Sequence, residues 1–343
     1  MTPRRSRRWR YVPAAALEGR PHVVVDGAPR PGTRCTLSHW PATPTPEELW
    51  ADTSAGIVRR ALARPRSLPK GVEVATIDHY DADGIIALGL LTVDGLDERC
   101  GDRLERAAAA GDFDVVADRR DALVAFALGA LGRAEAGGGP GSGGDDLAAA
   151  AARGLEALPG LAEDPGEFEA LWGAEAAAYD AAVALAADGA LGIEEHPQRD
   201  LAVVRVDPAV AAAAGAGWAG AVVHRAVVHS ATSCLRVATV AGDRLEVRYR
   251  YETWVRLASR RPRPRVDLGA LARTLTEAEP DGGSWLFDGA GAITPALHRP
   301  GGAPSGLDPE RFLTLVGAAL DDLDRGAPAW DPYARVGSVP VTG

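Results

Sequence analysis

The chain has 343 residues, a hydrophobic fraction of 46% and a charged fraction of 24%, which are the proportions of an ordinary globular protein. Its net charge of −10 argues against non-specific binding of nucleic acid by the protein as a whole, and no stretch approaches the roughly 20 apolar residues that span a bilayer. Three well-separated cysteines, Cys35, Cys100 and Cys234, make neither a zinc motif nor a disulfide framework and predict a reducing, cytoplasmic location.

The first half of the chain predicts strands that alternate with helices. Residues 1–20 are rich in arginine and contain only a short apolar run, so we expect a disordered basic arm there. Capping residues and apolar spacing then indicate strands and helix starts in chain order. The predicted strands lie at 22–25, 34–37 and 71–77, and the predicted helices begin near 45, 53, 85 and 121.

The pattern changes in the second half. A glycine-rich loop at 134–146 and alanine-rich helical segments to about 187 are followed by predicted strands and two amphipathic helices. The strands lie at 201–206, 235–240 and 245–251, and the helices at 267–279 and 309–323. We therefore predict the α/β class, with a parallel-sheet domain over 21–190 and a smaller α+β domain over 191–343.

The segment Ile77-Asp78-His79-Tyr80-Asp81-Ala82-Asp83-Gly84 carries the most chemistry. It places three carboxylates and an imidazole at the end of a strand, where like charges repel unless a cation or a strong hydrogen-bond network balances them. Hard divalent cations bind such oxygen-rich, negatively charged sites. We therefore predict a metal site containing Asp78, Asp81 and Asp83, with a solvated turn as the alternative.

Familiar phosphate and metal motifs do not account for this segment. An EF-hand loop with Gly84 at its sixth position would place Leu90 where an acid is required. The chain also has no P-loop, because its only lysine, Lys70, lies outside any glycine-rich setting. The acidic segment is therefore interpreted from its position at a strand end.

Two earlier strands are predicted to end near the same place. Asp26 follows the strand at 22–25, and His39 follows the strand at 34–37. Because parallel strands end at one edge of a sheet, we expect both side chains to lie close to the acidic segment. Taken alone, Asp26 is an ordinary turn residue before Gly27, and His39 is a partly buried structural histidine.

Four segments together resemble the DHH phosphoesterases, a family that contains exonucleases, nano-RNases and family II inorganic pyrophosphatases. Tyr80-Asp81-Ala82-Asp83-Gly84-Ile85 resembles the first motif, and Val25-Asp26 resembles the second. Leu37-Ser38-His39-Trp40-Pro41 resembles the namesake segment with Ser38 and Trp40 substituted, and 52–58 is similar to the segment that follows it. The rotated motif order implies a circular permutation. The chain also resembles uncharacterised actinobacterial proteins with this motif set.

The resemblance implies a DHH-like fold and a hydrolase that cleaves a phosphoester or phosphoanhydride with two Mn²⁺ or Mg²⁺ ions. The substrate would be a nucleotide, a short oligonucleotide or another small phosphorylated molecule, and no membrane would be involved. By the same resemblance, His39 and His79 are candidate catalytic residues that ligate an ion or donate a proton. The implied ligands are Asp26, Asp78, Asp81 and Asp83. The alternatives are a non-catalytic nucleotide- or phosphate-binding module derived from such an enzyme, and a structural metal site.

The second half of the chain contains an arginine- and aromatic-rich stretch at 248–265. Guanidinium groups bind phosphate through paired hydrogen bonds, and aromatic rings stack on nucleobases. An exposed strand with surface arginines is the alternative. The residues predicted to bind substrate are Arg248, Arg250, Trp254, Arg261 and Arg263.

Overall fold

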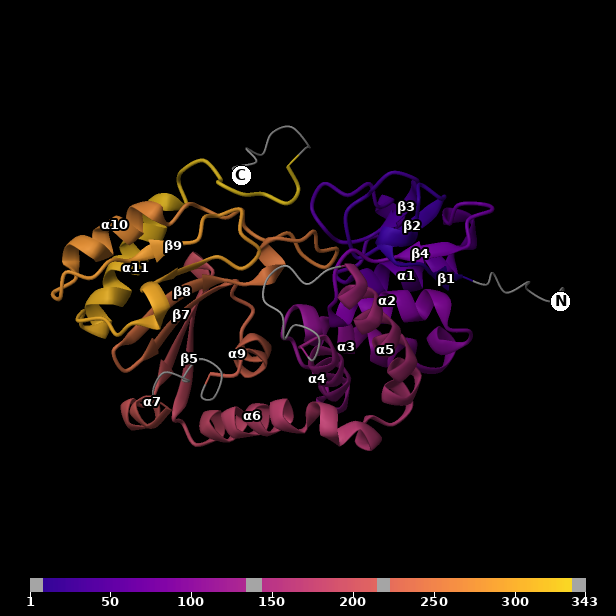
Figure 1. Ribbon diagram of the computed structural model, residues 1–343. Coiled ribbons are helices and arrows are strands. Elements are labelled where there is room, and N and C mark those ends of the chain that lie inside the picture. Colours follow the sequence, from indigo (N-terminus) through magenta and orange to yellow (C-terminus); the bar gives the residue numbers. More distant parts are fainter. Residues whose placement is uncertain (1–8, 134–143, 215–222, 335–343) are drawn as a thin grey trace. The chain divides into compact units, whose positions relative to one another are not determined.

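Figure 1 shows the computed structural model, which describes residues 9–133, 144–214 and 223–334. The chain divides into two compact units. Unit 1 comprises Met1–Ala176 and Arg256–Arg261, and unit 2 comprises Ala177–Val255 and Pro262–Gly343. The boundary therefore lies earlier than the predicted one at 190, and a short segment from the second half of the chain belongs to unit 1.

Unit 1 is built on a four-stranded sheet in which every neighbouring pair is parallel. The strand order is β1 (Arg10–Tyr11), β4 (Val74–Thr76), β2 (His22–Val25) and β3 (Thr33–Leu37). The accompanying helices are α1 (Ser54–Ala63), α2 (Ala82–Thr92), α3 (Leu96–Asp112), α4 (Arg119–Arg133), α5 (Gly144–Glu163) and the first part of α6 (Glu169–Ala187). The predicted α/β class with a parallel sheet is therefore confirmed.

Helix α2 forms the centre of this unit. Its residues are apolar on all sides, and Ile85, Ile86 and Leu88 are completely buried. A helix that is apolar all round must be covered on every face, and α2 packs against α1, α3 and α5. This packing brings the start of α2, the start of α1 and the end of α3 to the edge of the sheet where β2, β3 and β4 end.

The connection from β2 to β3 is unusually short for two parallel strands, which are normally joined by a dozen or more residues. The segment 26–32 makes this turn with Gly32 at φ +93°, a conformation that favours glycine. A Cβ at this position would lie 2.6 Å from the carbonyl oxygen of Gly19 and 2.7 Å from that of Arg20. Gly32 is therefore required for the crossover that places Asp26.

Unit 2 contains a six-stranded mixed sheet with helices on both faces. The strand order is β5 (Leu191–His196), β6 (Leu201–Val206), β7 (Arg236–Ala241), β8 (Arg244–Tyr249), β10 (Ala296–His298) and β9 (Leu286–Phe287), with only β6 and β7 parallel. One core contains Leu271 of α10 (Gly269–Ala278) and Phe312 of α11 (Pro309–Leu323). The other contains Ala182 of α6, Ala211 of α7 (Pro208–Ala214) and Val227 of α9 (Arg225–Ala231).

Several local predictions differ from the structure. Residues 1–8 and the glycine-rich stretch 134–143 lie outside the described residues, but Trp9 is buried and Arg10–Tyr11 pairs with β4, so the described part of the predicted arm is ordered. The helix predicted near 45 is only a single 3₁₀ turn, Glu47–Leu49, because Trp50 is extended. Helix α3 was not predicted. No helix in the described residues is long and apolar enough to cross a membrane.

Replacing Gly32 with alanine tests the crossover. We expect Gly32→Ala to lower the free energy of unfolding by about 2 kcal/mol or more, because the new Cβ combines a strained φ with two backbone clashes. Gly71→Ala is the matched control, since Gly71 also has positive φ (+73°) but no heavy atom near the Cβ position. Urea denaturation followed by circular dichroism measures both, and equal losses would contradict the steric argument.

Candidate metal centre

Five of the six predicted metal and catalytic residues meet in unit 1, together with one residue that was not predicted. We call this set the acidic centre. Its members come from the ends of β2, β3 and β4, the start of α2 and the end of α3. They are Asp26, His39, His79, Asp81, Asp83 and Asp112.

Asp26 lies at the middle of the acidic centre and is completely buried, with its backbone at φ +45°. Its Oδ1 accepts a hydrogen bond from Ser54 Oγ at 2.7 Å and lies 3.6 Å from Nε2 of His39. Its Oδ2 lies 3.4 Å from Nε2 of His79 and accepts no hydrogen bond from any described residue. The two oxygens of one carboxylate therefore face two different histidines.

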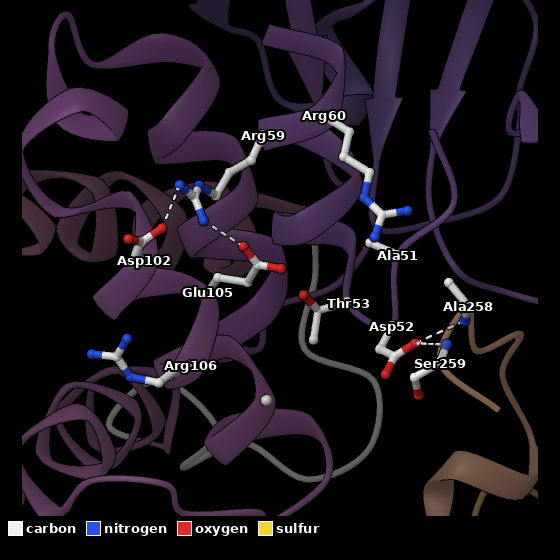
Figure 2. Close-up of a pocket in the computed structure, with 11 residues that line it drawn as sticks. Ala51, Asp52, Thr53, Arg59, Arg60, Asp102, Glu105, Arg106, Ala258 and Ser259 are labelled. Carbon is white, nitrogen blue, oxygen red and sulfur yellow. Dashed lines mark hydrogen bonds and ion pairs between the residues drawn. The ribbon is translucent and has the colours of Figure 1, made fainter. Parts of the chain in front are cut away.

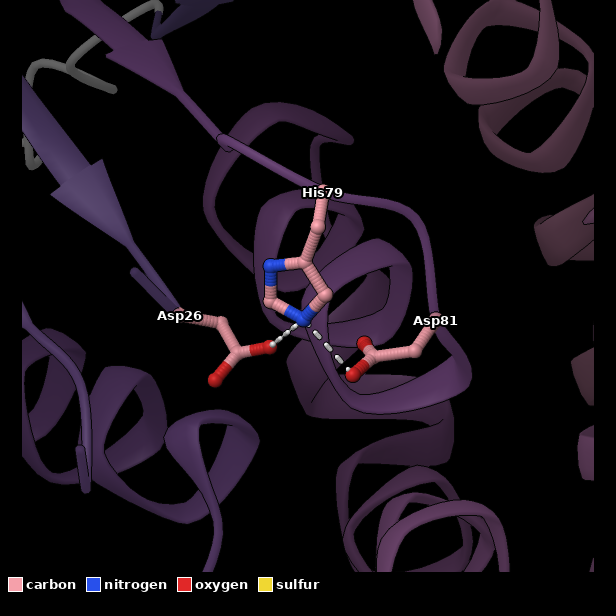
Figure 3. A group of neighbouring side chains, drawn as sticks. All are labelled: Asp26, His79 and Asp81. Atoms are coloured by element: carbon pink, nitrogen blue, oxygen red, sulfur yellow. Dashed lines mark hydrogen bonds and ion pairs between the residues drawn. The ribbon is translucent and has the colours of Figure 1, made fainter. Parts of the chain in front are cut away.

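The ligand atoms fall into two groups that share Asp26. The first group is Asp26, His79 and Asp81, drawn in Figure 3, and the second is Asp26, His39 and Asp83. Within each group the potential ligand atoms lie within 4.8 Å of one another. A shared carboxylate between two such groups is the arrangement expected of a two-ion site.

Both histidines are oriented by a hydrogen bond at Nδ1. His39 Nδ1 lies 2.6 Å from the carbonyl oxygen of Asp52, and His79 Nδ1 lies 2.9 Å from Oδ1 of Asp78. Holding Nδ1 in this way leaves Nε2 directed at the carboxylates, as in metal-binding histidines, whose other ring nitrogen is usually fixed by a carbonyl or carboxylate oxygen.

Asp78 has a different place from the one predicted. It belongs to neither ligand group in the described residues, and its Oδ2 accepts a hydrogen bond from the backbone of Ala28 at 3.0 Å. The Asp78 carboxylate lies close to the backbone of Gly27, where an added Cβ would be only 2.6 Å from it. Asp78 therefore orients His79 from the side and does not join the acidic centre itself.

The N-terminus of α1 holds the second group in place. Both oxygens of Asp83 accept backbone hydrogen bonds, from Ser54 N–H at 2.6 Å and Ala55 N–H at 2.8 Å. Free N–H groups and the dipole at a helix N-terminus favour a carboxylate there. Asp81 acts in the same way on its own helix, capping α2 through Gly84 N–H at 2.7 Å.

Asp112, the last residue of α3, is the member that sequence reasoning missed. Its side chain is 3% exposed, and its Oδ2 lies 3.3 Å from Nε2 of His39 without accepting a hydrogen bond from the described residues. A signal was present, because Leu104, Ala108 and Asp112 are spaced four apart and share the buried face of the helix. A carboxylate on such a face requires a partner.

Burial and mutual repulsion shift the pKa values of the carboxyl groups. Burial, with the nearby charge of Asp81, raises the pKa of Asp83 to about 7. The same two causes raise the pKa of Asp26 well above its ordinary value. Burial and the charge of Asp83 do the same for Asp112. Three carboxylic acids are thus poised to lose protons to a cation.

The pKa values of the two histidines are shifted in opposite directions. Burial lowers the pKa of His39 to about 4, so this imidazole is neutral and able to ligate. For His79, burial lowers the pKa, but the charge of Asp81 and the hydrogen bonds to Asp78 and Asp81 outweigh it and raise the pKa to about 12. A cation that takes Nε2 of His79 must therefore displace a proton.

The residues present fit divalent cations. Two buried carboxylate oxygens, on Asp26 and Asp112, accept no hydrogen bond among the described residues. Space between the acids is kept open by Gly84, whose Cβ would lie 3.1 Å from Asp81 Oδ1 and 3.2 Å from Asp26 Oδ2. Carboxylate oxygens with imidazole nitrogens suit Mn²⁺ or Mg²⁺ in preference to a thiolate-selecting metal.

The predicted substrate-binding residues are divided between the two units. Arg261 belongs to unit 1, and the other four belong to unit 2. Arg250 is 2% exposed, pairs with Glu252 and donates to the carbonyl oxygen of Thr232 at 2.9 Å. Its guanidinium is used inside the fold, which corrects its prediction as a substrate contact.

The remaining three residues also have partners within unit 2. Arg248 donates to the carbonyl oxygen of Thr294 at 3.3 Å, and Arg263 donates to that of Gln198 at 2.9 Å. Trp254 stacks between Tyr251 and Trp330, with ring centroids 5.9 and 6.2 Å away. Their role as substrate contacts stays a prediction.

A polar pocket of about 580 Å³ lies beside the segment that precedes α1 (Figure 2). Its walls come from that segment, from α1 and α3, and from the 256–261 segment of unit 1. Arg59, in one wall, is held by Asp97 and Asp102 at 2.7 Å and by Glu105 at 2.5 Å. The pocket thus borders the two elements, α1 and α3, that contribute to the acidic centre.

Comparison with known proteins gives one match. The model of a family of unknown function, DUF6687, matches residues 7–322. No curated protein and no solved structure matches the chain.

The pKa shifts predict how stability without a cation depends on pH. The raised pKa of Asp83 stabilises the fold at low pH, and this contribution is lost as pH rises through about 7. The raised pKa of His79 stabilises the fold fully below about pH 6.5, and this stabilisation is lost as pH rises toward 12. The lowered pKa of His39 destabilises the fold, but only below about pH 6.5. We therefore expect the melting temperature in EDTA to fall between pH 6.5 and 8.5.

Differential scanning fluorimetry in EDTA and in Mn²⁺ checks this expectation. Mn²⁺ should raise the melting temperature more at pH 8.5 than at pH 6.5, because fewer protons must then be displaced. Asp83→Asn, which cannot titrate, should remove the part of the EDTA profile that lies below about pH 7, whereas the fall above pH 7, which comes from His79, should remain. A wild-type melting temperature that is constant across this window would contradict the electrostatic account.

Proposed function

The chain belongs to the DUF6687 family, and we propose that it is a hydrolase that cleaves a phosphoester or phosphoanhydride with two divalent cations, Mn²⁺ or Mg²⁺. The observation that carries the proposal is the shared carboxylate of Asp26 between two groups of ligand atoms. Its substrate class is a nucleotide, a short oligonucleotide or another small phosphorylated molecule.

The ligands divide between the two ions as follows. Asp26, His79 and Asp81 would hold the first ion, and Asp26, His39 and Asp83 would hold the second. Asp112 lies beside the second group, 3.3 Å from His39, and would complete it. Two such ions would lower the pKa of a water molecule at the site and neutralise charge on the attacked phosphoryl group.

The side chains around the acidic centre define its open side. His79 and Asp81 are each 33% exposed, whereas the side chains of Asp26, His39 and Asp83 are completely buried. Substrate would therefore approach from the side of His79. His39, which is buried and fixed through Nδ1, serves as a ligand, and proton transfer to a leaving oxygen falls to His79 or to water.

Arg30 supplies a positive charge at this open side. Its guanidinium is 30% exposed and lies 4.0 Å from the carboxylate of Asp78, which in turn holds His79. A guanidinium in this position could bind a phosphoryl oxygen of the substrate while Asp78 remains within reach.

We also propose that unit 1 is DHH-like with its motifs in rotated order. Support comes from the four motif-like segments, whose polar residues Asp26, His39, Asp81 and Asp83 meet at one edge of a parallel sheet. The fourth motif-like segment contributes Ser54, which contacts Asp26 and Asp83. A circular permutation preserves such contacts because it changes connectivity and not packing.

Removing two ligands tests the function. We expect wild-type protein purified without chelator to contain up to two ions per chain. Asp81→Ala/Asp83→Ala should weaken Mn²⁺ binding by at least about 100-fold, because it removes a ligand from each group. Asp94→Ala/Glu98→Ala, which removes two exposed acids, is the matched control.

Metal content by mass spectrometry and calorimetric Mn²⁺ titration measure binding, and release of phosphate or nucleotide from pyrophosphate, dinucleotides and cyclic dinucleotides measures turnover. Loss of both in the double variant, with the control unchanged, supports the proposal. Equal hydrolysis by the double variant and wild type would mean that the site is wrongly assigned. Metal binding with no turnover on any of these substrates would instead indicate a binding module.

A milder change tests the place of Asp112. Asp112→Asn keeps the shape of the side chain but removes a charge that faces only the second group. We expect about 10-fold weaker binding of one ion and no change for the other, measured by the same titration. Unchanged binding of both ions would exclude Asp112 from the site.

A further inference from the structure

We infer that Asp52 is a positioning residue for the second ion: it clamps residues 256–261 and thereby holds His39 in its ligating orientation. The inference rests on the proposed two-ion function. We call residues 256–261 the strap. It belongs to unit 1, although the chain on both sides of it belongs to unit 2.

The strap is attached to unit 1 at three points. The N–H groups of Ala258 and Ser259 donate to one oxygen of Asp52, at 2.7 and 2.8 Å (Figure 2). The N–H of Arg256 donates to the carbonyl oxygen of His39 at 2.9 Å. The guanidinium of Arg256 also lies 3.8 Å from the centre of the Trp50 ring, within cation–π distance. Both Asp52 and His39 are therefore contacted directly.

Asp52 connects the strap to the ligands of the second ion. Its side chain binds the strap, and its backbone carbonyl accepts the Nδ1–H of His39. Two residues follow it along the chain. Thr53 caps α1, and Ser54 donates hydrogen bonds to Asp26 and Asp83. A movement of Asp52 would thus disturb every ligand of the second group.

The segment around Asp52 has little regular structure to hold it. The preceding 3₁₀ turn ends at Leu49, Trp50 is extended, and α1 begins only at Ser54. On one side this segment lines the pocket of about 580 Å³, so no side chain fills the space next to it there. Within this segment, Ala51 and Thr53 are buried, whereas the side chain of Asp52 lines the pocket and is fixed there by charge-assisted hydrogen bonds to the strap.

The histidine ligand of the first ion is positioned independently of the strap. This histidine, His79, is held by Asp78, which is held by the backbone of Ala28. Among the described residues, no hydrogen bond or ion pair joins the strap to His79 or Asp81. The loss of the Asp52 clamp should therefore weaken the second ion much more than the first, which shares only Asp26 with it. This asymmetry distinguishes positioning from a general loss of stability.

The test uses the full-length protein with Asp52→Ala and Asp52→Asn. Two-site Mn²⁺ titration should show about 10-fold weaker binding of one ion in Asp52→Ala, and less than a twofold change for the other. Asp52→Asn keeps an oxygen acceptor for the strap and should recover part of the lost affinity. With Co²⁺ in place of Mn²⁺, the visible absorption of one ion should change in Asp52→Ala, because its imidazole ligand is no longer fixed.

Two other variants serve as controls for this titration. Asp102→Ala removes an acid that lines the same pocket but touches neither the strap nor His39 in the described contacts, and should leave both affinities unchanged. Asp78→Ala should weaken the other ion, since Asp78 holds His79. Should Asp52→Ala fail to fold, Arg256→Ala removes the contact with Trp50 while keeping the backbone hydrogen bond, and should weaken the same ion as Asp52→Ala would.

An NMR measurement on metal-free protein tests this inference separately from the proposed function. The Nδ1–H of His39 should give a protected proton signal in the NMR spectrum of wild type, and this signal should broaden in Asp52→Ala. If wild type binds no ion but the signal depends on Asp52, the two-ion function fails and the clamp on His39 stands. If Asp52→Ala is folded and binds both ions like wild type, or loses both equally, the clamp is overturned.

Discussion

The arrangement of unit 1 depends on one electrostatic constraint, the burial of the three carboxylates of Asp26, Asp83 and Asp112 at one edge of its sheet. Burial alone disfavours the charged form of each acid, and their proximity adds repulsion, as the raised pKa values of Asp26, Asp83 and Asp112 show. An apolar core would be more favourable at this position. The fold keeps the acids instead, and it surrounds them with helix termini, two histidines and space beside Gly84.

The short segment from Asp52 to Ala55 gathers most of these compensating contacts. Its backbone and side chains bind His39, Asp26 and Asp83, and the same segment begins α1. One local feature, a helix start placed against the end of a sheet, thus positions ligands that are distant in sequence. Asp83 lies in the first turn of α2, which is buried on all sides. The packing of α2 against α1 and α3 therefore fixes the distances within the acidic centre.

Sequence reasoning reached the strands and most of the predicted ligands, because Asp26, His39 and Asp81 each lie within five residues of the end of an apolar run that reads as a parallel strand. It could not distinguish the role of Asp78 from that of Asp81, because both acids lie near the end of one strand. Only the fold shows that the Asp78 carboxylate accepts a hydrogen bond from the backbone of Ala28. Asp112 was missed because α3 is rich in charge and alanine and was not recognised as a helix. Arg250 looked like a surface arginine, and only the fold shows that Glu252 and three backbone carbonyls enclose it.

The two ligand groups differ in a way that bears on mechanism. The second group is buried and held by α1, by Asp52 and through it by the strap, so its geometry is largely preformed. In the first group His79 and Asp81 are each one-third exposed, and His79 carries a proton that a cation must displace. A site of this kind would hold one ion firmly and exchange the other with solvent or with a substrate that arrives with its own cation. In the proposed hydrolase, the open side, where Arg30 and His79 lie, would be where chemistry and substrate selection occur, while the buried side would maintain the charge balance on which both depend.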